Sequence, residues 1–600
     1  MAKSRKRSRR SASSKAKARS TKGRKPAGPR APAAPKPATP QAPRDWAEVG
    51  RAYGLLLFSA VLMFLGFAGF GVWPLAFVGM VPALFVFDAE PKPTGWRFFW
   101  RALFFGYVAY YGGFYWVVDT IVDFGGFPYA LALLFASVYF LYQAFEFVFV
   151  LWLWRRARER GFNATLALVA AYLTAETVFP MLFDHYYGNS FHMLPRLVQV
   201  ADLGGPMLLT ALAMAGNGAL YEVLRARVVE KKPLPWISPA VFAGLLAFYL
   251  GYGTWRMADV EAQVAGAPKI TVGVVQTNMG IFEKREDPGE GLRRHLAQSR
   301  RLEAEGDLDL LIWPESAATF RLPRNMGAPV YDYLGSALRW YGIESPGLPE
   351  TPLLFGGLSA EQRNGERRLY NTAFITNAGG EVQGHYDKTY LLAFGEYIPL
   401  GETFPILYDW SPNTGHFTPG DHVQPLPFDD YRIGTLVCYE DIIPRFVRSM
   451  MREGDPHLLV NITNDAWFGD TQEPYVHLAL AKMRAVEHHR YLVRATNTGI
   501  SAIVDPVGRV VEEGPLFDRA SLRGEVAMLS AWTPYRTLGD WPGWLALGAM
   551  LYMVFVGRRN RPEESPPPEE QVRPDRIRRE DEDDDDPDEG GETDDAEEET

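Results

Sequence analysis

The chain of 600 residues contains a single cysteine, Cys438, and its surroundings in the sequence are those of a nucleophile. It ends the apolar run 434–437 and is followed by Tyr439 and the acidic residues Glu440 and Asp441. A buried strand that ends in this way lifts a thiol into a polar cleft, where the thiol can attack a carbonyl carbon. A lone cysteine is more often a small buried apolar residue. The chemical interpretation therefore depends on finding groups that would serve the thiol.

Two residues upstream have the chemistry that a cysteine nucleophile needs. Glu315 follows the apolar run 310–314, so its carboxylate emerges where a strand stops. A free thiol, with a pKa of about 8.5, is mostly protonated at neutral pH, and a carboxylate in an apolar cleft can take its proton. The ammonium of Lys388, with a backbone N–H, can stabilise the oxyanion of a tetrahedral intermediate. Either residue alone is usually a surface charge, but with Cys438 they supply the parts of acyl transfer.

The elements that position these residues are predicted to form an α/β domain over residues 268–530. Apolar runs of strand length recur between helical stretches, as in strands that are covered on both faces. The turn sequences 377–380 and 505–508 are expected to divide hairpins. The predicted strands are Ile270–Gln276, Leu308–Trp313, Leu353–Leu358, Thr372–Thr376, Ile433–Cys438, His457–Ile462 and Ile500–Val504.

Residues 51–255 are more apolar than this domain and predict a bundle of about seven transmembrane helices, since about 20 apolar residues cross a bilayer. Lys and Arg collect in every second loop, which places both chain ends in the cytoplasm and residues 268–530 on the far side of the membrane. The predicted spans are 52–70, 72–88, 99–118, 128–153, 163–182, 205–224 and 237–253, followed after the α/β domain by a final helix at 538–557.

Both ends of the chain are charged and low in apolar residues, so residues 1–50 and 558–600 are expected to be disordered. Residues 1–45 carry 15 Lys and Arg against one acidic residue, whereas residues 561–600 carry 20 Asp and Glu against five Arg. The basic segment is interpreted as a cytosolic tail that helps to fix topology, and no nucleic-acid partner is expected. No metal or cofactor is expected either, because the scattered His residues show no ligand spacing and no phosphate-binding loop is present.

Four polar residues fall within the predicted spans. A polar side chain inside a membrane is a candidate for function by its location. Interhelical hydrogen bonding is the simpler interpretation, and we favour it. The four are Gln143, Glu146, Glu176 and Asn217.

Three motifs resemble, in order, the Glu-Lys-Cys set of the nitrilase (carbon–nitrogen hydrolase) superfamily. They are Trp313-Pro314-Glu315, Tyr386-Asp387-Lys388 and Cys438-Tyr439-Glu440. The longer strings at 392–399, 464–470 and 494–501, with membrane spans on both sides, resemble the apolipoprotein N-acyltransferase branch of that superfamily over residues 50–557.

This resemblance implies an αββα sandwich on a membrane bundle, with Glu315 as general base, Lys388 as oxyanion partner and Cys438 as nucleophile. Glu396 is implied as a carboxylate that orients Lys388 or supports proton transfer, and Tyr439 as part of the pocket. For Glu440, a supporting role beside the nucleophile and a pairing with a nearby Arg are both open.

Other residues of the resembling strings are interpreted as scaffold, namely Asn464, Asp465 and Trp467. One position departs from the family pattern. Arg285 stands where a Trp is usual, with Phe282 as a candidate replacement for that aromatic ring. The departure bears on substrate contacts and not on the acyl-transfer residues.

The reaction that the resemblance implies moves an acyl chain from a membrane phospholipid, through a thioester on Cys438, to the α-amino group of diacylglyceryl-cysteine at the N-terminus of an apolipoprotein. It implies a monomer in the bacterial inner membrane with a periplasmic catalytic domain. A membrane-tethered amidase or nitrilase acting on a small amide is the alternative, but it leaves eight spans unexplained. A non-enzymatic scaffold is a second alternative, favoured only if one of the three key residues were missing.

Overall fold

The computed structural model describes residues 46–363, 365–393, 395–410 and 414–556. The two charged tails lie outside these residues, except for 46–50, which were expected to be disordered and instead begin helix α1 (Trp46–Leu65). Glu48 in the first turn of α1 favours a helix start there, because a carboxylate stabilises the positive end of the helix dipole.

Apolar helices precede the α/β domain. In the described part of the chain, four are long and apolar enough to cross a membrane: α1, α5 (Tyr129–Glu159), α9 with its final turn (Pro206–Val229) and α10 (Ile237–Gly266). Shorter apolar helices are η1 with α2 (Trp73–Asp88), α6 (Ala164–Val178) and, after the domain, α19 with its final turn (Trp541–Val556).

Several predicted spans have the wrong bounds. Helix α1 ends at Leu65 rather than at 70, α5 runs to Glu159 rather than to 153, and α10 runs to Gly266 rather than to 253. The segment 99–118 is not one helix but two, α3 (Trp96–Gly113) and α4 (Trp116–Gly125), because Phe114 leaves the helical conformation after a pair of glycines. Helix α6 ends at Val178 rather than at 182, since Phe179 precedes Pro180 and is extended.

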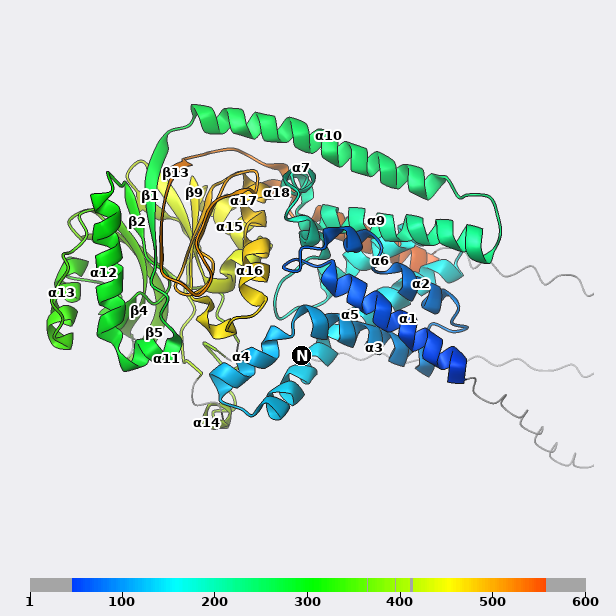
Figure 1. Ribbon diagram of the computed structural model, residues 1–600, viewed down its shortest axis with the longest axis horizontal. Coiled ribbons are helices and arrows are strands. Elements are labelled where there is room, and N and C mark those ends of the chain that lie inside the picture. Colours follow the sequence, from blue (N-terminus) through cyan, green and yellow to red (C-terminus); the bar gives the residue numbers. More distant parts are fainter. Residues whose placement is uncertain (1–45, 364, 394, 411–413, 557–600) are drawn as a thin grey trace, which may run out of the picture. The chain divides into compact units, whose positions relative to one another are not determined.

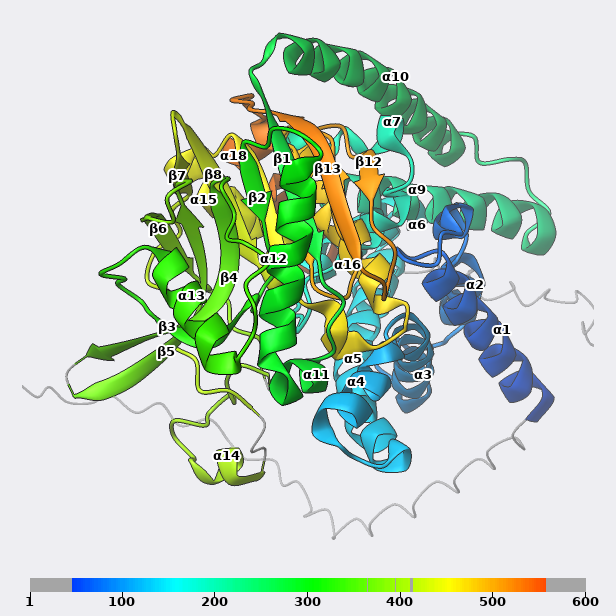
Figure 2. The same ribbon diagram turned by 60° about the vertical axis from the view of Figure 1, so that its left-hand side comes forward.

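Two mixed sheets form the core of the α/β domain. The first has seven strands in the order β13-β1-β2-β4-β5-β6, with β3 paired to β4. Its strands are β1 (Lys269–Gln276), β2 (Leu310–Ile312), β3 (Ala318–Pro323), β4 (Leu353–Arg363), β5 (Glu366–Thr376), β6 (Val382–Asp387) and β13 (Ala520–Ala527). Figure 2 shows the long β4–β5 hairpin extending beyond its neighbours.

The second sheet has six strands in the order β12-β11-β10-β9-β8-β7. These are β7 (Leu426–Phe428), β8 (Tyr431–Val437), β9 (Leu458–Thr463), β10 (Leu492–Thr496), β11 (Ala502–Val504) and β12 (Val510–Glu513). All seven predicted strands are present, and the turns 377–380 and 505–508 join the antiparallel pairs β5–β6 and β11–β12 as predicted.

The two sheets lie face to face between two layers of helices, which is the expected αββα arrangement (Figure 1). Helices α12 (Pro288–Ala304) and α13 (Val330–Tyr341) cover the first sheet, and α15 (Pro444–Gly454), α16 (Glu473–Ala481) and α17 (Met483–His488) cover the second. Successive strand residues point alternately to the other sheet and to the helices that cover their own sheet. Leu310 and Ile312 pack between the sheets, whereas Leu311 packs under the helices.

Candidate active site

Cys438 ends strand β8 and begins the short helical turn η4 (Cys438–Ile442). Its backbone has a φ of +56°, a left-handed conformation that is uncommon for a residue with a side chain. Asn461 of β9 supports this corner, because its Nδ2 donates to the carbonyl oxygen of Cys438 at 2.9 Å. The thiol side chain is 5% exposed. The strand end predicted from sequence therefore carries the thiol on a sharp, supported turn.

Glu315 follows strand β2 and is buried. Its Oε1 accepts a hydrogen bond of 2.7 Å from Nδ2 of Asn371, which lies on β5. The same nitrogen donates to Oε1 of Glu396 at 2.9 Å. The other oxygen of Glu315, Oε2, has no hydrogen-bond partner in the part of the chain that the structure describes, and so it is free to accept a proton.

Lys388 directly follows β6 and is 1% exposed. Its Nζ lies 2.8 Å from Oε2 of Glu396, so the expected contact between these two residues is present. The ammonium also lies 5.4 Å from the ring centroid of Tyr439, the residue after the nucleophile. The backbone N–H of Lys388 donates to the carbonyl of Asn371 at 2.8 Å. Asn371 therefore contacts the carboxylates by its side chain and the lysine by its backbone.

The charges of these residues act on one another. Burial raises the pKa of the Cys438 thiol well above its usual range and the Glu315 carboxylate adds to this, whereas Lys388 lowers it. Burial also raises the pKa of Glu315, against the effect of Lys388. Burial lowers the pKa of Lys388, but Glu396, Cys438 and Glu315 together raise it by more, so the lysine stays cationic. Burial thus favours the protonated form of both the Cys438 thiol and the Glu315 carboxyl, whereas Lys388 favours the charged form of each.

Glu440 is fully buried, and burial raises its pKa to about 7 against the effect of backbone N–H donors. It accepts hydrogen bonds from the backbone N–H groups of Val437, Thr389 and Tyr390 at 2.8–3.0 Å. Among the ion pairs of the described residues none involves Glu440, so the interpretation as a partner of Arg is wrong. The side chain instead joins the nucleophile turn to the loop after Lys388.

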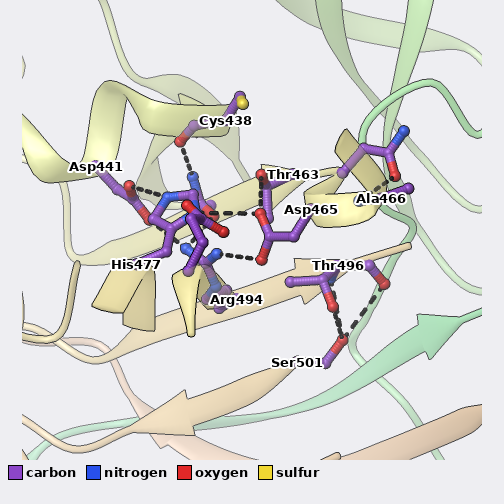
Figure 3. A network of polar contacts seen from close by, with 12 residues as sticks. Cys438, Asp441, Thr463, Asp465, Ala466, His477, Arg494, Thr496 and Ser501 are labelled. Atoms are coloured by element: carbon purple, nitrogen blue, oxygen red, sulfur yellow. Dashed lines mark hydrogen bonds and ion pairs between the residues drawn. The ribbon is translucent and has the colours of Figure 1, made fainter. Parts of the chain in front are cut away.

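Behind the nucleophile turn lies a buried network of charged residues (Figure 3). His477 contacts Asp441 through Nε2 at 2.9 Å and Asp465 through Nδ1 at 3.1 Å. Arg494 on β10 donates to the same two carboxylates at 2.7 and 2.8 Å. It also donates to Oδ1 of Asn461 at 3.2 Å, so the network reaches the residue that supports Cys438.

A metal ion is not needed to balance this cluster. Asp465, Glu473 and His477 carry ligand atoms close enough together for one ion. Arg494 and His477, however, already give Asp465 its positive partners, and they hold the pKa of that carboxyl below its usual range despite burial. Burial raises the pKa of Glu473 well above its usual range. Asp441 and Asp465 thus each contact both Arg494 and His477.

Three residues of the site are missing from the sequence prediction. Glu315 and Cys438 were predicted because each lies at the end of a strand. Asn371 lies just before a predicted strand, so the same signal does not indicate it. His477 lies on a helix without any local motif. Lys284 of α11 (Ile281–Glu286) reaches the carbonyl oxygen of Ser316 at 3.4 Å, and burial lowers its pKa to about 8 against the effect of Glu315. The side chains of Arg285 and Phe282 lie outside the described set.

The αββα domain thus brings a buried cysteine, glutamate and lysine to the ends of its strands. The carbon-nitrogen hydrolase family model matches residues 271–528, and the model of the apolipoprotein N-acyltransferase N-terminal domain matches residues 59–219. Apolipoprotein N-acyltransferase of Geobacter metallireducens is 33% identical over 522 residues, covering 85% of this chain and 96% of that protein. The protein of the same name from Azotobacter vinelandii is 32% identical over 528 residues with the same coverage. The chain belongs to the apolipoprotein N-acyltransferase family.

Proposed function

We propose that this protein transfers an acyl chain from a membrane phospholipid to the N-terminal α-amino group of diacylglyceryl-cysteine in an apolipoprotein, through a thioester on Cys438. The observation that carries the proposal is the cluster of Glu315, Asn371, Glu396 and Lys388 around a buried cysteine in a chain with apolar helices on both sides of it. A soluble amide would not need those helices, whereas two lipid substrates would.

In the first half-reaction, Glu315 takes the thiol proton as the sulfur of Cys438 attacks the ester carbonyl carbon of the phospholipid. Lys388 stabilises the oxyanion of the tetrahedral intermediate, held in place by Glu396. When the C–O bond breaks, Glu315 gives the proton to the departing lysophospholipid oxygen. The acyl chain remains on sulfur as a thioester.

In the second half-reaction, the neutral α-amino group of the acceptor attacks the thioester carbonyl carbon, and Glu315 takes a proton from the nitrogen. The C–S bond breaks, the thiolate recovers a proton and the acceptor leaves as an amide. Lys388 has the same role in both halves because both pass through an oxyanion at the same carbon.

The membrane arrangement belongs to the same proposal. We propose seven spans before the catalytic domain and one after it, with both tails in the cytoplasm and the domain on the periplasmic side of the bacterial inner membrane. The excess of Lys and Arg in every second loop supports this orientation. Residues 51–255, 268–530 and 538–557 are then the bundle, the catalytic domain and the final helix. Every proposed catalytic group comes from one chain, so a monomer suffices.

The test is transfer of acyl chains from phospholipid vesicles to a diacylated lipopeptide by the purified full-length protein, with amide formation followed by mass spectrometry. The wild-type protein is expected to add one acyl chain to the α-amino group, and an N-acetylated lipopeptide is expected to stay unchanged. Cys438→Ala should give no product. Turnover of a small soluble amide without transfer to the lipopeptide would favour the tethered amidase instead.

A further inference from the structure

A small cavity with polar and aromatic walls lies inside the helical bundle, separate from the residues of the active site. Its volume is about 40 Å³, compared with the roughly 10–15 Å³ that one water needs, so it admits a small polar group. Of the four polar span residues, Asn217, Glu146 and Glu176 form interhelical hydrogen bonds as expected, whereas the buried amide of Gln143 has no partner among the described residues. Glu146 and Glu176 also line this cavity. The other polar residues of its wall are Tyr110, Tyr172, His185 and Tyr187.

The cavity lies at one end of the bundle. Tyr110 is in the last turn of α3 and Glu176 in the last turn of α6. The catalytic domain joins the bundle at this same end, where Arg445 of α15 pairs with Asp184 at 3.3 Å, next to His185. The ends of membrane-spanning helices are at the depth of lipid headgroups. The cavity is therefore placed where a headgroup or an acceptor terminus can reach it.

Glu176 has one bonded and one unbonded oxygen on this wall. Oε1 of Glu176 accepts from the backbone N–H of Tyr187 at 2.8 Å and from Oγ1 of Thr210 at 3.0 Å. Its other oxygen, Oε2, has no partner among the described residues, although the side chain is only 8% exposed. A carboxylate oxygen left in this state is costly unless a ligand satisfies it.

The neighbouring groups add acceptors rather than positive charge. Glu146 accepts from the hydroxyl of Tyr110. Nδ1 of His185 lies 2.8 Å from the carbonyl oxygen of Phe183, so Nδ1 carries the hydrogen and Nε2 presents a lone pair toward Tyr110 at 3.4 Å. In the described part of the chain neither glutamate forms an ion pair. The wall thus has two carboxylates without a cation.

We propose that this cavity binds a primary ammonium group. An ammonium brings one positive charge and three N–H donors, which match the unpaired oxygen of Glu176 and the carboxylate of Glu146. The rings of Phe67, Phe114 and Phe147 line the rest of the cavity and attract a cation over their faces. A ligand without N–H or O–H donors would leave Oε2 of Glu176 unsatisfied.

Two substrates of the proposed function carry such a group: a phospholipid with an ethanolamine headgroup and the free α-amino terminus of the acceptor. The inference rests on the proposed function only for this choice of probes. Binding is therefore measured without turnover, in the full-length chain with Cys438→Ala, so that a failure of acyl transfer and a failure of this site give different results.

The experiment counts ligands retained by the protein in native mass spectrometry. The probes are phosphatidylethanolamine against phosphatidylglycerol, and a diacylated lipopeptide with a free against an acetylated N-terminus. Glu176→Gln and Glu146→Gln remove charge at constant size. The matched control is Glu222→Gln, since Glu222 bonds Thr165 and Ser238 within the bundle and does not line the cavity.

In both cavity variants, retention of one amine-bearing probe is expected to fall about tenfold or more. Retention of phosphatidylglycerol should stay unchanged in these variants, and the Glu222→Gln variant should retain every probe as the parent protein does. Loss of phosphatidylethanolamine identifies the headgroup as the ligand, and loss of the free-amine lipopeptide identifies the acceptor. Unchanged retention of both amine-bearing probes would overturn the proposal. An equal loss of phosphatidylethanolamine and phosphatidylglycerol would also overturn it, because the amine would then not be recognised.

Discussion

Asn371 is the residue on which the arrangement of the site depends most. One side-chain nitrogen donates to both Glu315 and Glu396, which holds the two carboxylates close together despite their mutual repulsion. Each carboxylate then has one oxygen left for its own task. Glu396 binds Lys388, and Oε2 of Glu315 has no partner among the described residues, as its proposed role of base for the thiol proton requires.

Replacing Asn371 by Asp tests this role. Asn371→Asp exchanges the shared donor for a third carboxyl group, so Glu315 and Glu396 lose their common partner and repel the new charge. We expect the rate of thioester formation on Cys438 to fall about 100-fold, an effect of the size seen when one preorganised donor is lost. Asn377→Asp, in the exposed turn between β5 and β6, is the control and should leave the rate unchanged. An equal rate in both variants would contradict the role of Asn371.

Among the elements, strand β4 lies against the backbone of the proposed base. A Cβ on Gly356 would lie 2.7 Å from Cα of Glu315 and 3.0 Å from the carbonyl oxygen of Pro314. A Cβ on the next residue, Gly357, would meet only side-chain atoms of Ala318 and Leu322, at 3.1 and 3.4 Å. The two glycines face opposite sides of the strand, so they form a matched pair.

Gly356→Ala is expected to displace Glu315, because neither backbone can yield without moving the other. It should destabilise the protein by about 1–3 kcal/mol and slow thioester formation. Gly357→Ala should change the rate much less, since its contacts are longer and none of them involves Glu315. Thermal unfolding and the acylation rate of both variants measure the effect. A faster reaction in Gly356→Ala than in Gly357→Ala would count against the close approach of β4 to Glu315.

The charged network behind Cys438 predicts a pH dependence of stability. Burial and Arg494 lower the pKa of His477, but Asp441 and Asp465 raise it by more, to about 10. The folded protein therefore holds a proton that the unfolded chain releases near its ordinary pKa of about 6.5. The stabilisation is complete below pH 6.5 and is lost as pH rises through 10, at up to about 1.4 kcal/mol per pH unit.

His477→Gln should remove this pH dependence and lower the free energy of unfolding at pH 6. The measurement is denaturant unfolding of the full-length protein between pH 6 and pH 10. His422→Gln is the control, because that histidine is exposed and should leave the slope as in the wild type. The same slope in wild type and His477→Gln would show that the imidazole titrates normally, against the network described here.

The local sequence predicted strands that are continuous apolar runs. It missed a strand that contains a charged residue, because the burial of that residue depends on ion-pair partners far away in the sequence. Strands such as β1 and β8 are continuous apolar runs, and their ends carry the motif residues. Strand β10 was missed because Arg494 interrupts it, and nothing local indicates that this guanidinium is buried between two carboxylates. Asn371 and His477 have functional positions only once the sheets bring distant segments together, so neither was predicted.

At the scale of the whole molecule, the single cysteine makes the proposed topology easy to test. In the Cys438→Ala background, Ser13→Cys places a thiol in the basic tail and Ser345→Cys places one on the exposed surface of the α/β domain. A maleimide that cannot cross the membrane is expected to label Ser345→Cys in intact spheroplasts. It should label Ser13→Cys only after lysis, because the proposed topology has both tails in the cytoplasm. Labelling of the tail without lysis would reverse the assignment.

The most direct test of the central claim is the intact mass of the full-length protein after incubation with phospholipid vesicles and no acceptor. The wild type is expected to gain one acyl chain, which hydroxylamine removes because the bond is a thioester. Cys438→Ala is expected to gain nothing, and Glu315→Gln should gain it about 10² to 10⁴ times more slowly, since the thiol loses its base. A wild type that turns over lipid without any adduct on Cys438, or an adduct that persists in Cys438→Ala, would contradict the proposed mechanism.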